Sequence, residues 1–265
     1  MAEDVAALAQ QNRILAAVPP DELSRLLSRS ALVKLDFRSV LLKRGEPVRH
    51  VYFPVSGLYS LLAPAAKGDT VEVSTVGREG IIGIGVHLGS DIAYCTAIAQ
   101  VPGEAIRIEA DAFRDEVTRC ENVTTLTGRY IHALYVQTVQ WVACNRLHSL
   151  EERFARWLLS SADTLGGDAL PLTHDFLAKM LGVRRPSVTL AAGALQRAGL
   201  IDSSRGLIRI VNRERLEGIS CECYRLVRAH YEYLLGTAQN REPDESDDGR
   251  NGSSSADTYE SPESR

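Results

Sequence analysis

The segment that most constrains this chain runs from residue 172 to 199, where two short helices joined by a tight turn are predicted. Thr173 is a favoured capping residue for the first helix, and Gly182 can adopt the positive φ needed to leave it. The second helix opens with Arg184 and Arg185. Arginines at the start of such a helix can pair with guanine O6 and N7 in the major groove. The segment therefore predicts a DNA-reading helix-turn-helix, and an ordinary helical hairpin with solvated arginines is the alternative.

The residues after this segment predict a wing. Two short apolar runs, 200–202 and 207–211, flank the turn 203–206, which is typical of a β-hairpin. Phosphate contacts position a protein on the duplex, and base contacts specify its sequence. We expect Arg197 to be a solvated charge or a phosphate contact. The residues expected to position the protein are Thr173, His174 and Arg205, and those expected to read bases are Arg184, Arg185, Ser187 and Thr189, with Arg185 foremost.

The net charge of -4 is unevenly distributed along the chain. Residues 237–265 hold 3 basic and 8 acidic side chains, whereas residues 148–236 hold 12 basic and 10 acidic ones. The acidic tail has almost no apolar residues, so we expect it to be disordered. A passive solubilising tail is favoured over one that competes with DNA for the basic face. Because the charge of the DNA-binding module is only slightly positive, affinity should depend on placed arginines and on dimerisation.

Neither a membrane segment nor a metal site is predicted. The chain has no run of 18 apolar residues and no signal pattern at its N-terminus, so a cytoplasmic location is expected. Its five cysteines, Cys95, Cys120, Cys144, Cys221 and Cys223, show no CxxC or zinc-finger spacing and are expected to be free and mostly buried. Cys221, Cys223 and His230 are the one cluster for which a metal or redox role is considered. On a helix, residues i and i+2 point to different faces, which is poor geometry for joint metal ligation.

The N-terminal half predicts a small antiparallel roll. After helical segments at 5–15 and from Pro19 onward, the period changes to short strands separated by glycine-containing turns. The expected strands are 32–35, 39–42, 50–55, 58–62, 71–76, 93–99 and 104–108. Many short strands with turns at regular intervals are typical of an antiparallel sandwich or barrel.

A long helical stretch follows, from about residue 111 to 162, with breaks expected near Cys120 and His148. Its apolar stripe is broad enough to need two partners, one of them the roll. We expect the second partner to be the same helix of another chain, in a parallel coiled pair. A single buried helix in a monomer is the alternative. The expected dimer contacts are Leu126, Tyr130, Leu134, Gln137 and Trp141.

A β-roll, a long helix and a winged helix in this order resemble the Crp/Fnr family of bacterial transcription regulators, over roughly residues 14–217. The residues that carry the resemblance are the turns 44–46, 52–57 and 77–80 and the segment 173–195. The resemblance implies an α+β fold with an N-terminal antiparallel jelly-roll-like β-roll, a dimerisation helix and a C-terminal winged helix-turn-helix. The corresponding domains are 1–120, 121–147 and 148–236, followed by the tail 237–265. Pro186 stands where the family has a glutamate, which implies a different preferred DNA sequence.

The resemblance also implies an effector site in the roll, at Gly77, Arg78, Glu79, Gly80 and Thr96. Cyclic-nucleotide-binding relatives neutralise the phosphate with an arginine a little downstream, but residues 90–97 contain none. A buried phosphate without a paired cation is costly, so cyclic AMP bound in the usual way is disfavoured, although Arg78 could substitute. No cysteine precedes Cys95, so the N-terminal cysteines that hold an iron–sulfur centre in oxygen-sensing relatives are missing. No histidine stands out as a haem ligand, and no cofactor is identified.

These patterns predict a homodimeric DNA-binding regulator in which an effector shifts a two-state equilibrium. Its expected partners are double-stranded promoter DNA and a second copy of the chain, with RNA polymerase as a further candidate. A small-molecule-binding signalling protein whose winged helix serves protein contacts is the alternative. An enzyme is not expected, because the sequence has no nucleophile elbow, no P-loop and no metal-ligand set.

Overall fold

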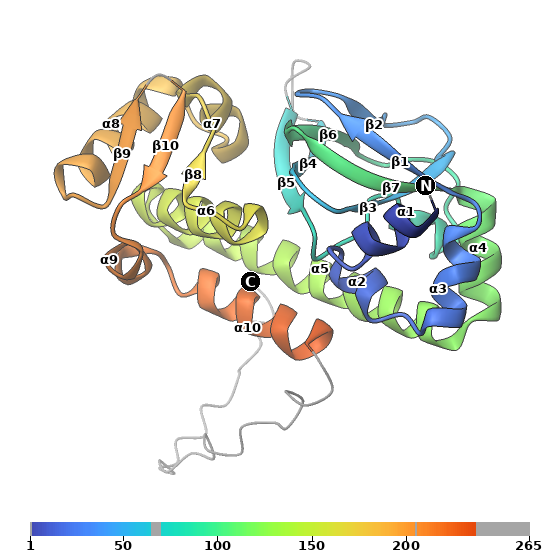
Figure 1. Ribbon diagram of the computed structural model, residues 1–265. Coiled ribbons are helices and arrows are strands. Elements are labelled where there is room, and N and C mark those ends of the chain that lie inside the picture. The colour runs from blue at the N-terminus through green and yellow to red at the C-terminus, as the bar shows by residue number, and fades with distance from the viewer. Residues whose placement is uncertain (1, 65–69, 205, 237–265) are drawn as a thin grey trace, which may run out of the picture.

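The computed structural model describes residues 2–64, 70–204 and 206–236. Its chain forms an N-terminal roll and a C-terminal helix-rich unit, with a long helix beneath both (Figure 1). The turn at 67–69, Arg205 at the expected wing tip and the acidic tail 237–265 lie outside the described residues.

The N-terminal unit is the expected antiparallel roll, preceded by three short helices. Two sheets form it, one in the order β1-β7-β3 and the other in the order β2-β6-β4-β5, with every pairing antiparallel. The elements are α1 (Ala2–Ala9), α2 (Arg13–Ala16), α3 (Pro20–Leu27), β1 (Ser30–Leu35), β2 (Val40–Leu42), β3 (His50–Pro54), β4 (Leu58–Pro64), β5 (Thr70–Val76), β6 (Thr96–Val101) and β7 (Gly103–Glu109).

Alternating side chains fill the roll. Phe53 on β3 pairs in register with Ile106 on β7, and its ring packs edge-on against Phe113. All three residues are buried. The turn between β3 and β4 depends on Gly57, whose φ is 82° and whose Cα approaches the turn from β6 to β7 so closely that an added Cβ would lie 2.8 Å from the Val101 carbonyl oxygen. Only glycine fits this turn without strain.

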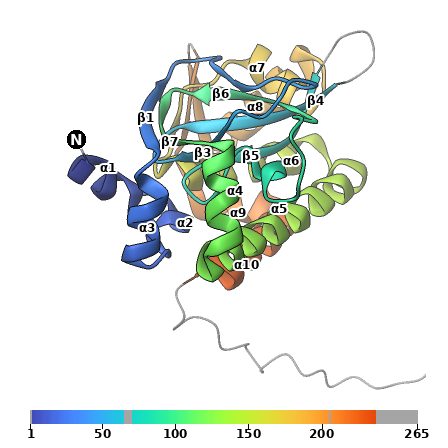
Figure 2. The ribbon, with the colours of Figure 1, turned by 90° about the vertical axis from the view of Figure 1, so that its right-hand side faces the viewer.

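Three helices follow the roll, with both expected breaks present: α4 (Ala110–Arg119), α5 (Glu121–Leu147) and α6 (Leu150–Leu165). Cys120 and His148 are in extended conformations and separate them. Ser149 begins α6 with a capping box, because its hydroxyl accepts from the Glu152 amide while the Glu152 carboxylate accepts from the Ser149 amide. The structure confirms a long helix below the roll (Figure 2).

The last helix, α10 (Cys223–Leu235), returns along α5 in the antiparallel direction. Tyr231 and Leu235 on α10 belong to the same buried core as the roll and α5. The core of the C-terminal unit instead comprises residues of α6, of α9 (Arg213–Ile219) and of the segment between them, together with Tyr224. The expected domain 148–236 therefore includes a helix that packs mainly on the long helix.

The C-terminal unit rests on the roll through a buried polar contact. Glu72 on β5 accepts hydrogen bonds from the Ser60 hydroxyl at 2.6 Å and from the Trp157 indole N–H at 2.8 Å. Trp157 lies on α6, and Leu62 of the roll belongs to the core of the C-terminal unit. Burial raises the pKa of Glu72 from 4.5 to about 7, against the opposing effects of these two donors and of Arg156.

Glu72→Gln is expected to flatten the dependence of stability on pH. The folded-state pKa lies above the ordinary value, so the contribution of this carboxyl to stability is fully present below pH 4.5 and is lost as the pH rises through about 7. The loss is on the order of 3 kcal/mol. Thermal unfolding at pH 5 and pH 8 measures it: wild type should lose stability between the two values and the variant much less. The exposed Asp36→Asn serves as control, and equal losses in wild type and Glu72→Gln would contradict the assignment.

Candidate nucleic-acid interface

The expected helix-turn-helix is present as α7 (His174–Leu181) and α8 (Arg185–Arg197). The Thr173 hydroxyl caps α7 by accepting from the Phe176 amide at 3.2 Å. Gly182 ends the helix with a φ of 65°. The wing is also present, as β9 (Ile201–Ser204) and β10 (Leu207–Ile210), with β8 (Ala169–Leu170) pairing on the other side of β10.

Helix α8 has a buried face and an open face. Val188, Ala191 and Leu195 are buried in the core of the C-terminal unit. Helical periodicity allows either Leu190 or Ala191 on this inner face, and the structure buries Ala191 and leaves Leu190 72% exposed. Pro186 is the second helical residue rather than the first, and its missing N–H still needs no partner within the helix.

The predicted base-reading residues lie at the start of α8. Arg184 precedes the first turn, Arg185 begins it, and both are exposed. The Arg185 Nε lies 3.3 Å from the Asp175 carboxylate on α7, in an ion pair whose two side chains are 65% and 67% exposed. Such exposed pairs contribute little stability, so the guanidinium is free to exchange this partner for a base. Ser187 is half-buried and Thr189 exposed on the next turn.

His174 connects the three parts of this interface. Its Nδ1 lies 3.1 Å from the Thr189 hydroxyl on α8, and its Nε2 lies 3.2 Å from the Ser203 hydroxyl on β9. The Thr189 hydroxyl also donates to the Arg185 carbonyl at 3.2 Å. Through these two contacts, His174 helps to fix the position of α8 relative to the wing strand β9.

Two exposed residues of this surface are not among those that the sequence predicts to contact DNA. Leu190 follows Thr189 on the open face of α8, and Arg209 is exposed on β10. The alternation of β10, in which Ile208 and Ile210 are buried, is the signal that would have placed Arg209 outward. Arg197 is exposed at the far end of α8.

The residues expected at a dimer interface are buried against their own chain. The Gln137 amide donates to the Ser74 hydroxyl on β5 at 2.7 Å, and Tyr130 packs against Gly80 of the roll. The Arg156 guanidinium of α6 lies 4.7 Å from the Trp141 ring centroid. Leu126 and Leu134 also lie in the core of the roll. All five point into the monomer, because the roll, α6 and α10 of the same chain cover the broad stripe.

A different face of α5 is open. Tyr135, Val139 and Val142 are 65%, 49% and 68% exposed. They follow one another at spacings of four and three residues, which is the spacing of the apolar residues in a coiled coil. The sequence places Tyr135 and Val142 in the same broad stripe but not among the expected dimer contacts, because the position of α10, which covers part of the stripe, could not be predicted from the pattern of α5.

The five residues expected to bind an effector divide between two places. Arg78 and Glu79 line a cavity of about 430 Å³ between the roll, α5, α6 and α10, together with Gln137 and Trp141. The Glu79 carboxylate accepts from the Gly77 amide at 2.7 Å, and burial raises the pKa of Glu79. Thr96 lies elsewhere, on β6, where its hydroxyl accepts from the Arg44 amide at 3.3 Å.

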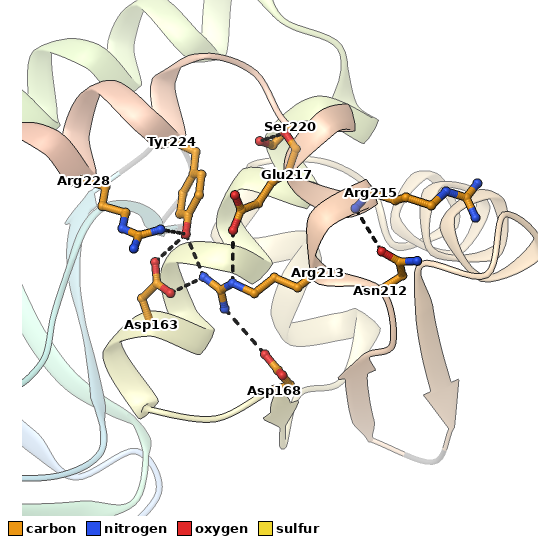
Figure 3. A network of polar contacts seen from close by, with 9 residues as sticks. All are labelled: Asp163, Asp168, Asn212, Arg213, Arg215, Glu217, Ser220, Tyr224 and Arg228. Atoms are coloured by element: carbon orange, nitrogen blue, oxygen red, sulfur yellow. Dashed lines mark hydrogen bonds and ion pairs between the residues drawn. The ribbon is translucent and has the colours of Figure 1, made fainter.

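A polar network borders this cavity and holds α6, α9 and α10 together (Figure 3). Arg213 on α9 forms ion pairs with Asp163, Asp168 and Glu217. It also donates to the Tyr224 hydroxyl of α10 at 2.7 Å, and that hydroxyl donates to Asp163 at 2.7 Å. Because the Arg213 guanidinium contacts side chains of all three helices, a movement of α10 would change contacts within the C-terminal unit.

Comparison with known families agrees with this architecture. Residues 32–120 match the cyclic nucleotide-binding domain, and residues 152–219 match the Crp-like helix-turn-helix domain. The two matches together span more than half of the chain. The chain belongs to the Crp/Fnr family of transcriptional regulators. As a Crp/Fnr regulator it is a DNA-binding protein and not an enzyme, as the sequence indicated.

Solved structures of Crp/Fnr regulators share the fold. FixK2 from Bradyrhizobium japonicum aligns with a TM-score of 0.64 at 15% identity, over 72% of this chain and 98% of that one. The c-di-GMP responsive global regulator CLP of Xanthomonas campestris aligns with a TM-score of 0.61 at 16% identity, over 72% and 99%. The CRP-family regulator TTHB099 of Thermus thermophilus aligns with a TM-score of 0.59 at 22% identity, over 71% and 96%. No curated protein matches the chain. Within the described part of this Crp/Fnr regulator, no helix is long and apolar enough to cross a membrane.

Proposed function

We propose that this Crp/Fnr regulator acts as a homodimer that reads promoter DNA with Arg184, Arg185, Ser187 and Thr189 of each α8. The supporting observation is the two-faced environment of α8. Its inner face is buried in the core, while both arginines at its start are exposed. Among the described residues, the one ion pair that either arginine makes is the exposed pair of Arg185 with Asp175. The wing strands beside it present Arg209 for a phosphate contact.

Selection of bound duplexes from a random DNA library, with the full-length protein, tests this function. An enriched sequence motif is expected. If the winged helix serves protein contacts instead, no motif will be enriched, and binding will lack the steep salt dependence of phosphate contacts.

The proposed dimer forms through the open seam of α5. Crp-type regulators are typically dimeric, and isologous pairing is the commonest form of oligomer. Tyr135, Val139 and Val142 supply an apolar strip for the equivalent strip of a second chain. RNA polymerase is a further candidate partner, and the described residues do not identify a surface for it.

The proposed effector site is the cavity lined by Arg78 and Glu79. Arg13 and Arg228 add two cations to its wall, and Asp163 and Glu232 add two carboxylates. The cavity adjoins α5, α6 and α10, so an occupant would contact both the roll and the helices that carry the reading unit. A ligand with different affinity for two arrangements of these helices would shift their equilibrium.

Cyclic AMP is expected to leave the thermal stability unchanged. A ligand at 100 times its Kd would stabilise the protein by about 2.7 kcal/mol and raise the melting temperature by several degrees. Residues 90–97, where relatives carry the phosphate-binding arginine, contain none; the exposed Tyr94 and the buried Cys95 lie there, just before β6. Thermal shift at 1 mM cyclic AMP measures this, and a clear rise that disappears in Arg78→Ala would show that Arg78 has replaced the missing arginine.

A further inference from the structure

Four metal-ligating side chains converge where α5 meets α10. One ligand atom each from Cys144, His148, Cys221 and Cys223 lies within 4.8 Å of all the others. The Cys144 and Cys221 sulfurs are 3.4 Å apart, and the Cys223 sulfur is 3.6 Å from His148 Nδ1. The three cysteines are buried and unoxidised, and His148 is half-buried.

The sequence predicts no metal site here, on a geometric ground that the structure does not support. That ground assumes that Cys221 and Cys223 share one helix. The structure places Cys221 in the linker after Ser220, the residue that caps α9, and of these two cysteines only Cys223 is helical. Their thiols can therefore converge. His230, the histidine considered with them, lies elsewhere with its ring 5.2 Å from that of His132. The missed signal is the pair Cys144 and His148, four residues apart at the end of α5.

Two of the six distances between the ligand atoms match one tetrahedral ion, and the other four are no longer than 4.8 Å. With Zn–S near 2.3 Å and Zn–N near 2.0–2.1 Å, a regular tetrahedron places two sulfurs about 3.8 Å apart and a sulfur and a nitrogen about 3.6 Å apart. The two pair distances of 3.4 and 3.6 Å match within a few tenths of an ångström. An iron–sulfur cluster distributes its ligands over several metal atoms, so its ligand atoms lie farther apart than the four ligand atoms of this group. Three thiolates and one imidazole are a common structural zinc set.

The surroundings orient the four ligands. His148 Nε2 lies 3.2 Å from the Glu222 carboxylate, which leaves Nδ1 directed at the thiols. Metal-bound histidines usually have such a carboxylate or carbonyl on the other ring nitrogen. The Gln140 amide donates to the Cys223 sulfur at 3.1 Å. Three thiolates and Zn²⁺ leave one negative charge on the site.

We propose that Cys144, His148, Cys221 and Cys223 bind one zinc ion, which fixes the start of α10 to the end of α5. The site lies between the long helix and the linker that leaves the reading unit. Bound zinc would hold α10 over the buried face of α5 and leave Tyr135, Val139 and Val142 as the open seam. Binding requires deprotonated thiols, so zinc uptake releases protons.

Elemental analysis of the purified full-length protein tests the proposal. We expect about one zinc per chain in wild type and in Cys120→Ser, whose cysteine is buried outside the group. Cys221→Ser removes one of the four ligands, so it should lower the zinc affinity by more than about tenfold and leave the purified protein well below one zinc per chain. His148→Cys, which keeps four ligands, should retain more zinc than His148→Ala. Wild type without zinc, or Cys221→Ser with full zinc, would overturn the proposal.

Cobalt substitution makes the test independent of any variant. Wild-type protein loaded with Co²⁺ should show thiolate-to-cobalt absorption and the strong visible bands of a tetrahedral site. It should bind one Co²⁺ per chain and release it when zinc is added. A Cys144–Cys221 disulfide in freshly purified protein, with no cobalt bound, would identify the group as a redox pair and contradict the zinc site.

Discussion

Replacing Arg185 by alanine is expected to abolish sequence-specific DNA binding at the positions that this residue reads. A bidentate arginine–guanine contact contributes about 1–3 kcal/mol of discrimination, or roughly 5- to 150-fold in affinity. Arg185 is 65% exposed, and its protein partner is one surface carboxylate, so the fold should be unaffected. Fluorescence anisotropy with the selected duplex and with single-base variants of it measures the effect.

The matched control is Arg225→Ala, which removes an exposed arginine on α10. It should keep both affinity and base preference. Arg209→Ala on the wing should weaken all duplexes to a similar extent, because phosphate contacts carry no sequence information. If Arg185→Ala has the same base preference as wild type, the assignment of Arg185 to base reading is wrong.

Val142→Asp is expected to separate the dimer into folded monomers. Val142 is 68% exposed in the single chain, so the substitution costs little within the monomer. In a two-fold seam the change buries two like charges beside each other, which costs at least about 3 kcal/mol, or more than 100-fold in the dimer dissociation constant. Sedimentation equilibrium measures that constant, and circular dichroism verifies the fold.

Two comparisons make this experiment specific. Tyr94→Asp places the same charge on another exposed apolar residue, outside α5, and should remain dimeric. Trp141→Asp should instead lower the stability of the monomer, because Trp141 is buried against Arg156 within one chain. A Val142→Asp protein that sediments as wild type would place the dimer contact elsewhere.

The sequence predicts the elements of this fold because they rest on local rules. The extended breaks at Cys120 and His148, the Thr173 cap and the positive φ of Gly182 follow from residue preferences within a few positions. The inward residues of α8 follow from helical periodicity. For the same reason, the arginines that open this helix can be recognised from the residues around them.

The partners of these elements depend on distant residues and could not be predicted in the same way. The stripe of α5 is broad because its own chain covers two sides of it, with Ser74 reaching Gln137 from the roll and α10 packing along its length. Cys144 and Cys221 are far apart in sequence, and only the return of α10 brings their sulfurs together. Periodicity indicates that a face is buried, and it does not say which segment covers it.

The pattern of half-sites in selected DNA tests the central claim most directly, because two α8 helices related by a two-fold axis must read two equivalent half-sites. We predict a palindromic motif whose half-sites lie one helical turn apart, about 10–10.5 base pairs from centre to centre. The Val142→Asp protein should lose this paired footprint. A single asymmetric site, bound equally well by wild type and by Val142→Asp, would contradict the account.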